Sequence, residues 1–198
     1  MTFKKHLDYF YHDSNWEAPE IVYGRNLFRE ISNTKEKYAV ITMPIPWELI
    51  EKDVVNTPAA VYFVPNMYLE TMEEMERTLP PDIEMVIGVG GGSSHDAAKY
   101  VAMKRQCRLL QMPTIFGGDS VVCNAIGIRE ERKVRYIGHT YAEKIYVDFG
   151  VIQKAPKLLV RYGAADILSS YTALMDWELA SNCGKETFLE LFNNRIIL

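Results

Sequence analysis

The sequence predicts an α/β protein with an open, doubly wound parallel sheet, followed by a region that contains only helices. Three observations indicate this fold. Short apolar runs alternate with helix-periodic segments, a glycine triplet joins one strand directly to a helix, and strand signals cease near residue 155. Such alternation is typical of parallel βαβ units, which bind ligands at the carboxyl ends of their strands. We therefore expect one domain over residues 1–155 and the beginning of an all-α domain over residues 156–198.

The first half of the chain supplies most of the expected sheet. Residues 85–89 are almost wholly apolar, as expected of a central strand that is covered on both faces. In the segment 67–79 the apolar side chains recur at helical spacing among acidic ones, and two prolines end it. The expected strands are 38–42, 60–64, 85–89 and 109–112, and the expected helices are 47–55, 67–79 and 94–105.

The second half changes character after Gln111. Residues 113–127 have the composition of a loop, and strands are expected at 134–137 and 144–147. Pro156 suits the first position of a helix, which we expect Gly163 to interrupt. A longer helix is then predicted over residues 164–181.

Composition narrows the class of protein. The 198 residues are 48% hydrophobic and 24% charged, as in ordinary globular proteins, and the formal net charge is −4. Without a dominant basic cluster, nucleic-acid binding is not expected. No segment approaches the roughly 20 apolar residues that cross a bilayer, and the start lacks a signal-peptide core, so we expect a cytoplasmic protein. Three widely spaced cysteines suggest neither a disulfide framework nor a thiolate zinc site.

The glycine triplet is the strongest functional signal. Gly90, Gly91 and Gly92 follow an apolar strand and precede a helix, and Ser93 and Ser94 are placed to cap that helix. The free N–H groups of its first turn, together with the helix dipole, favour an anion over the loop. We therefore predict a phosphate cradle, although a tight turn without ligand would have the same residues.

Three further polar residues are candidates for function, and each also has a structural explanation. Asp119 stands in a Gly-Gly-Asp-Ser sequence, where aspartate is favoured as a turn residue. Asp166 is expected in the first turn of the last helix, where a carboxylate is stabilised by the helix dipole; alternatively it binds a metal in a cleft between the domains. His95 is expected to face solvent or to pack against the loop.

The segment from Val86 to Lys99 resembles the nucleotide loop of the iron-dependent alcohol dehydrogenase, glycerol dehydrogenase and dehydroquinate synthase superfamily, whose pattern is Gly-Gly-Gly-Ser-x-x-Asp-x-x-Lys. Residues 112–114 resemble that family's Pro-Thr turn, and residues 147–156 resemble its strand-end aspartate and Lys-Ala-Pro segment. Residues 162–180 are most similar to sn-glycerol-1-phosphate dehydrogenases.

This resemblance implies a Rossmann-like domain, a helical domain, and a cleft that holds NAD or NADP and one divalent metal (zinc, iron or nickel). It also implies an oxidoreductase that acts on a polyol or a glycerol phosphate, for example by reducing dihydroxyacetone phosphate. Asp119 would contact the substrate, and Asp166 would bind the metal and the substrate; these two are the expected catalytic residues. The implied cofactor-binding residues are Gly90, Gly91, Gly92, Ser93, Ser94, Asp96, Thr114, Phe116, Gly117 and Cys123.

The sequence departs from the family pattern in places that matter for these expectations. The stretch Thr42 to Trp47 has no acidic residue to hold a ribose 2′-hydroxyl, which leaves NAD and NADP open. Family members are nearly twice as long and carry two metal-binding histidines beyond the region matched here. All four histidines of this chain precede Asp166, so we expect its metal site to be incomplete.

If the chain is a shortened dehydrogenase, an apolar face should be exposed on the helix around residues 171–179 and should drive self-association into a homo-oligomer. Two other functions stay open at this point. One is a sugar phosphate cyclase of the dehydroquinate synthase type, which uses NAD transiently and eliminates phosphate. The other is a nucleotide-binding fragment without activity.

Overall fold

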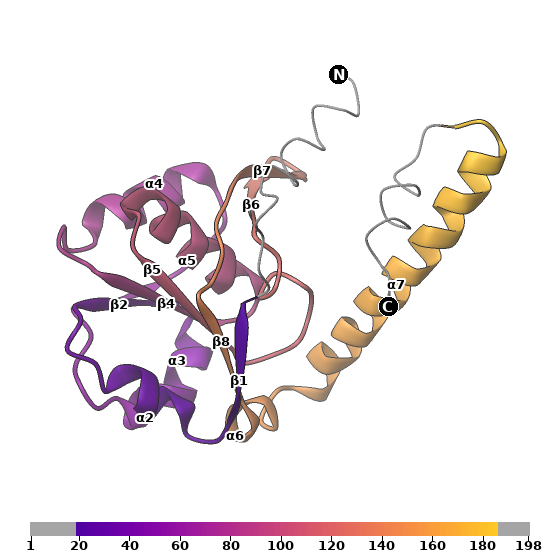
Figure 1. The fold of residues 1–198 in the computed structure, drawn as a ribbon. Coiled ribbons are helices and arrows are strands. Elements are labelled where there is room, and N and C mark those ends of the chain that lie inside the picture. Colours follow the sequence, from indigo (N-terminus) through magenta and orange to yellow (C-terminus); the bar gives the residue numbers. More distant parts are fainter. Residues whose placement is uncertain (1–18, 186–198) are drawn as a thin grey trace.

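Six parallel strands form the central sheet, in the order β1-β8-β5-β4-β2-β3, and β6 and β7 form a separate antiparallel hairpin (Figure 1). The computed structural model describes residues 19–185. Its elements are β1 (Glu20–Gly24), α2 (Leu27–Ser32), β2 (Tyr38–Thr42), α3 (Pro44–Ile50), the 3-10 turn η1 (Glu51–Asp53), β3 (Ala60–Phe63), α4 (Leu69–Thr78), β4 (Met85–Gly90), α5 (Gly92–Arg105), β5 (Arg108–Pro113), β6 (Ala125–Glu130), β7 (Lys133–His139), β8 (Lys144–Asp148), α6 (Phe149–Ile152) and α7 (Lys157–Asn182).

Both faces of the sheet are covered, which explains why its central strands are apolar throughout. Side chains of a strand alternate between the two faces. In β2, Ala39 and Ile41 join a core with α4, α5 and β6, whereas Tyr38 and Val40 join a second core with α2 and α3. The predicted α/β class with a parallel, Rossmann-like sheet is therefore confirmed.

Most predicted elements are present with small shifts of their ends. The strands expected at 38–42, 60–64, 85–89, 109–112, 134–137 and 144–147 correspond to β2, β3, β4, β5, β7 and β8. The helix expected at 47–55 begins earlier, because Pro44 occupies a first helical position, and it ends in η1. The prediction that 113–127 is entirely loop was wrong at its end, since β6 begins at Ala125.

The hairpin of β6 and β7 is attached to the sheet domain through Lys99. This residue of α5 is 1% exposed, and its ammonium donates hydrogen bonds of 2.8 Å to the carbonyl oxygens of Cys123 and Ala125. It also pairs with a carboxylate oxygen of Asp96 at 2.7 Å. Three acceptors thus satisfy the three donors of a buried ammonium, which is the condition for burying such a charge without a large penalty.

Helix α7 projects away from the layers of the sheet domain (Figure 1). It is one continuous helix of 26 residues, so the prediction that Gly163 interrupts it was wrong. Pro156 is its N-cap rather than its first helical residue. Within residues 19–185 no helix is long and apolar enough to cross a membrane.

The predicted apolar face on this helix is confirmed. Eight large hydrophobic side chains of α7 are between 48% and 76% exposed; they are Leu158, Val160, Tyr162, Ile167, Leu168, Tyr171, Met175 and Leu179. No strand follows residue 155 in the described part of the chain, and the domain boundary placed there stays a prediction. The last residues of the predicted helical domain, 186–198, lie outside the described part.

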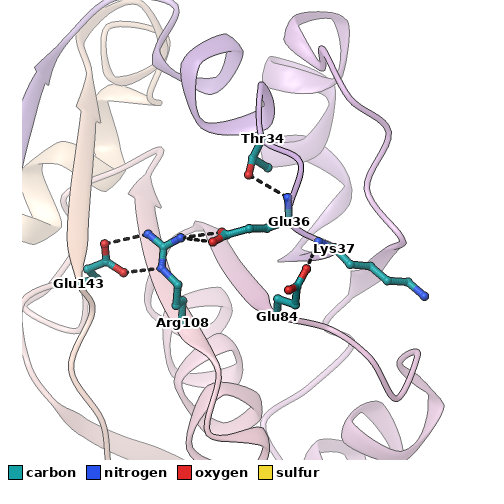
Figure 2. Close-up of polar contacts among 6 residues, drawn as sticks. All are labelled: Thr34, Glu36, Lys37, Glu84, Arg108 and Glu143. Carbon is teal, nitrogen blue, oxygen red and sulfur yellow. Dashed lines mark hydrogen bonds and ion pairs between the residues drawn. The ribbon is translucent and has the colours of Figure 1, made fainter.

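At the edge of the sheet opposite the glycine turn, Arg108 joins two segments (Figure 2). Its guanidinium donates to Glu143 at 2.7 and 2.8 Å and to Glu36 at 2.6 Å. These bonds raise the pKa of Arg108, and the guanidinium in turn lowers the pKa of Glu143. Arg108 is 44% exposed, however, so water screens the cluster.

We predict that the two cations differ in their contribution to stability. Lys99→Met leaves the two inward carbonyls without this donor and the Asp96 carboxylate without its cation, and should reduce the free energy of unfolding by about 3 kcal/mol. Arg108→Met, in the exposed cluster, should reduce it by less than about 1 kcal/mol. Urea unfolding at pH 7 measures both. Equal losses in the two variants would contradict the central role given to Lys99.

Candidate functional site

The turn between β4 and α5 forms the centre of the candidate site. Gly90 has a φ of 145°, which an L side chain rarely adopts, and a Cβ there would also overlap the Ser94 hydroxyl. Its carbonyl oxygen accepts a hydrogen bond of 2.9 Å from the N–H of buried Thr114, which fixes the turn to the end of β5. The turn is thereby held in place by the fold itself.

The two following glycines let a ligand approach the helix. Helix α5 begins at Gly92 with Gly91 as its N-cap, and no side chain caps it, so the prediction that Ser93 or Ser94 is the cap was wrong. A Cβ on Gly91 would press against Ile115, whereas Gly92 is exposed and a Cβ there would make only an ordinary contact with Ser120, at 3.5 Å. The uncapped N–H groups of the first turn are therefore available to an anion.

Three cavities meet at this first turn. The largest, about 570 Å³, lies between residues 43–46, Leu49 and residues 154–156. The second, about 310 Å³, is bordered by Asp96, Asp119 and Cys123, and the third, about 190 Å³, by residues 117–118 and Tyr162. The first cavity shares Gly92 with the third and Ser93 with the second. We call the three cavities together the groove. They lie on both sides of the glycine turn, an arrangement that suits a molecule with a central diphosphate.

Asp96 holds the hairpin side of this groove together. One carboxylate oxygen pairs with Lys99 and accepts a 2.7 Å hydrogen bond from the Ser120 hydroxyl, and the other accepts the N–H of Gly127 at 3.1 Å. Both oxygens thus bind protein donors, while the side chain still borders the 310 Å³ cavity. Its predicted contact with the cofactor stays a prediction.

Asp119 and Cys123 lie on the loop that follows β5. The N–H groups of Val122 and Cys123 donate to the backbone carbonyl of Asp119 at 2.9 Å, so this aspartate begins a turn, and its side chain is left free to line the cavity. Burial raises the pKa of the Cys123 thiol, which remains protonated at neutral pH. Of the other predicted cofactor residues, Gly117 borders the 190 Å³ cavity and Phe116 is 41% exposed beside it.

Asp166 does not lie in the first turn of a helix, as predicted, because α7 already begins at Lys157. The dipole explanation for this carboxylate therefore does not hold. Asp166 is exposed, and its carboxylate is 3.5 Å from where a Cβ on Gly118 would lie, which brings α7 and the loop after β5 together.

The residues described do not by themselves fit a metal. Within residues 19–185 no group of three or more His, Cys, Asp or Glu side chains could hold a metal ion. A catalytic divalent metal normally has three protein ligands, and Asp166 would be one. His6 and His12 lie outside the described residues.

His95 was predicted to face solvent or to pack against the loop, and the first of these is wrong. The residue is 1% exposed, and it borders the 190 Å³ cavity. Neither ring nitrogen has a hydrogen-bond partner among the described residues. Burial, with the positive charge of Lys99 added, lowers the pKa of His95 to about 3, so the ring is neutral at physiological pH.

The sequence reading missed the role of Gly163. This residue is the one buried position of α7, and a Cβ there would overlap the carbonyl oxygen of Phe116. At Gly163, the backbone of α7 therefore packs directly against the backbone of the loop after β5. Glycine inside a helix is the only available signal for such a contact, and it is equally a signal for a break.

The fold defines a parallel α/β protein in which a glycine turn presents an uncapped helix end at the carboxyl edge of the sheet. The family profile described as iron-containing alcohol dehydrogenase matches residues 30–156, and the chain belongs to this family.

Relatives agree with this assignment. A glycerol-1-phosphate dehydrogenase [NAD(P)+] of Staphylothermus marinus is 27% identical over 186 residues, which are 86% of this chain and 52% of that protein. One from Methanosarcina mazei is 32% identical over 61% of this chain and 35% of its own length. The chain thus spans about half the length of the curated relatives it matches.

Solved structures share the fold. Glycerol dehydrogenase from Schizosaccharomyces pombe superposes with a TM-score of 0.69 at 22% identity, over 81% of this chain and 45% of that one. Sulfoacetaldehyde reductase from Bifidobacterium kashiwanohense, solved in complex with NAD+, gives 0.67 at 16% identity, over 78% and 51%.

We predict that His95 makes the fold sensitive to acid. Its pKa is lower in the folded than in the unfolded chain, so between about pH 6.5 and pH 3 the unfolded chain binds more protons. Stability is then full above pH 6.5 and falls on acidification by up to about 1.4 kcal/mol per pH unit. Urea unfolding from pH 7 to pH 4 should show this slope in the wild type and a shallower one in His95→Leu. In the matched control His139→Gln, at an exposed position, the slope should persist.

We also predict that Gly163→Ala detaches the first half of α7 from the loop after β5, because the added methyl group cannot coexist with the Phe116 carbonyl. Amide hydrogen exchange should become faster in residues 114–120 and 157–165. The neighbouring exposed variant Ala164→Ser should exchange as the wild type does. Unchanged protection in Gly163→Ala would show that the contact is not needed to seat the helix.

Proposed function

We propose that this chain forms the nucleotide-binding half of a metal-dependent, NAD(P)-linked oxidoreductase that acts on a polyol or a glycerol phosphate. The observation that carries this proposal is the glycine turn at residues 90–92, which presents the open end of α5 at the centre of a groove with a cavity on either side. The names of the relatives, glycerol-1-phosphate dehydrogenase [NAD(P)+], support the reaction class and the substrate class.

Different parts of the groove would bind different parts of the nucleotide. The first-turn N–H groups at Gly92 and Ser93 would bind the diphosphate, and the larger apolar cavity beside Leu49 would take the adenosine half. The nicotinamide half would then extend toward the cavity that Asp119 and Cys123 border. The bound nicotinamide supplies hydride transfer to or from the substrate carbon.

Asp166 supports the metal part of the proposal only as one ligand. It lies beside Gly118, at the edge of the groove where the substrate would meet the nicotinamide half. Because a single carboxylate holds a divalent ion weakly, the remaining ligands would have to come from outside the described residues. Nucleotide binding and metal binding are therefore separable in this chain.

A change at Gly92 tests the cradle without disturbing the fold. Gly92→Asp places a carboxylate at the first position of α5, where the helix dipole stabilises it by a few tenths to about 1 kcal/mol. The same carboxylate repels a diphosphate. We expect calorimetric titration with NADH and NADPH to show binding by the wild type and at least about tenfold weaker binding by the variant, which corresponds to about 1.4 kcal/mol.

Gly92→Ser is the matched control, because it adds a side chain of similar position without charge; it should bind within a few-fold of the wild type. Added zinc should leave the affinity of the wild type for nucleotide unchanged. If the wild type binds neither nucleotide, the glycine turn is only a structural turn and the proposed function fails. If Gly92→Asp binds as tightly as the wild type, the diphosphate does not lie on α5.

A further inference from the structure

Among the residues that line the 570 Å³ cavity beside the glycine turn, Lys154 is the single charged one. Its other walls are apolar or neutral. They come from the segment after β2, from the glycine turn, and from the segments that follow β5 and α6, and include Met43, Ile45, Leu49, Ile115, Pro156 and Leu159. A ligand in this cavity therefore meets one full positive charge and no negative one.

The residues after β2, where an acidic side chain would discriminate against a ribose 2′-phosphate, are uncharged. Strand β2 pairs directly with β4, the strand that ends in the glycine turn, so the residues after β2 border the same cavity. In dinucleotide-binding sheets an acidic residue near this position accepts the ribose 2′-hydroxyl and repels a 2′-phosphate. Here the position is taken by Met43 and Pro44. Nothing among the residues that border the cavity would reject a second phosphate.

The charged side chains of the segment that carries Lys154 are all basic. Between Asp148 and Asp166 there is no acidic residue, whereas Lys154, Lys157 and Arg161 are all basic. Arg25, at the end of β1, adds a further cation, because its guanidinium lies 3.4 Å from the side-chain oxygen of Gln153, the residue before Lys154. The buried Asp148 carboxylate accepts N–H groups of Leu27, Gly150 and Val151, so it is occupied by backbone donors. These cations make the segment locally positive, although the net charge of the whole chain is −4.

We infer that Lys154 determines cofactor choice by binding the 2′-phosphate of an adenosine nucleotide, so that the chain prefers NADPH to NADH. This inference rests on the proposed function, since it assumes that the adenosine half occupies the 570 Å³ cavity. An exposed lysine suits this task, because a phosphate dianion needs a mobile point charge and remains partly hydrated. Lys154 would thus recognise the 2′-phosphate by attraction, and Met43 would not repel it.

The test is a binding measurement that needs neither turnover nor metal. The probes are adenosine 2′,5′-bisphosphate and 5′-AMP, with NADPH and NADH as the corresponding full-length pair. The wild type should bind the 2′-phosphorylated member of each pair about fivefold more tightly or better at low ionic strength, as expected for one partly exposed ion pair. This preference should shrink as salt is added.

Variants separate Lys154 from its neighbours. Lys154→Met should lower the preference to below about twofold, by weakening the binding of NADPH more than that of NADH, and Lys154→Arg should retain it. Lys157→Met removes an equal charge from the same segment but from outside the cavity, so it should keep most of the preference.

The outcomes distinguish the two proposals. If the wild type binds both members of a pair equally, or if Lys154→Met keeps the wild-type preference, Lys154 does not bind the 2′-phosphate and this inference is wrong, while the cradle stands. If no probe binds to the wild type, the proposed function itself fails. A preference that Lys157→Met abolishes as fully as Lys154→Met would assign it to the general field of the segment and would also overturn the inference.

Discussion

The buried ammonium of Lys99 is the interaction on which the candidate site depends. It lies inside α5, the helix whose first turn forms the cradle, and it binds the Asp96 carboxylate and two carbonyl oxygens of the segment that leads into β6. A charge in this position has to be fully paired, because an unpaired buried ammonium is strongly unfavourable. The pairing therefore fixes the loop after β5 and the hairpin relative to α5, and it sets the width of the groove between them.

The parts of the fold that could be predicted are those that local patterns determine. Strand β4 could be read from its unbroken apolar run, because a strand covered on both faces has no polar side. Strand β6 could not, because Gly127 interrupts its pattern for a reason that lies elsewhere in the chain. A Cβ there would press against Asp96 and Val134. The same holds for Gly163, where the contact that demands glycine is with a carbonyl group 47 residues away in the sequence, on Phe116.

The site shows the same division. The glycine triplet predicted a cradle. The helix nevertheless begins two residues earlier than expected, because Gly91 takes the N-cap position, so Ser93 and Ser94 do not have the capping role that was predicted for them. Burial of His95 could not be foreseen, because α5 has almost no polar face: its residues from Ser94 to Ala102 are buried, apart from the partly exposed Asp96. The periodicity of apolar residues indicates which side of a helix is buried only when the opposite side is exposed to solvent.

The nucleotide site and the metal ligand that we propose depend on different contacts of the fold. The glycine turn is held by protein contacts, because the Gly90 carbonyl accepts the N–H of Thr114 and α5 is joined to the segment before β6 through Lys99. A turn that is held in this way would lose little conformational freedom on binding a ligand. Asp166, in contrast, is exposed on the helix that leaves the sheet domain, and the backbone of that helix approaches the loop after β5 most closely where Gly163 meets Phe116. In the function that we propose, nucleotide binding would therefore depend on contacts within the sheet domain, whereas a metal ligand at Asp166 would also require that α7 be held beside the loop after β5.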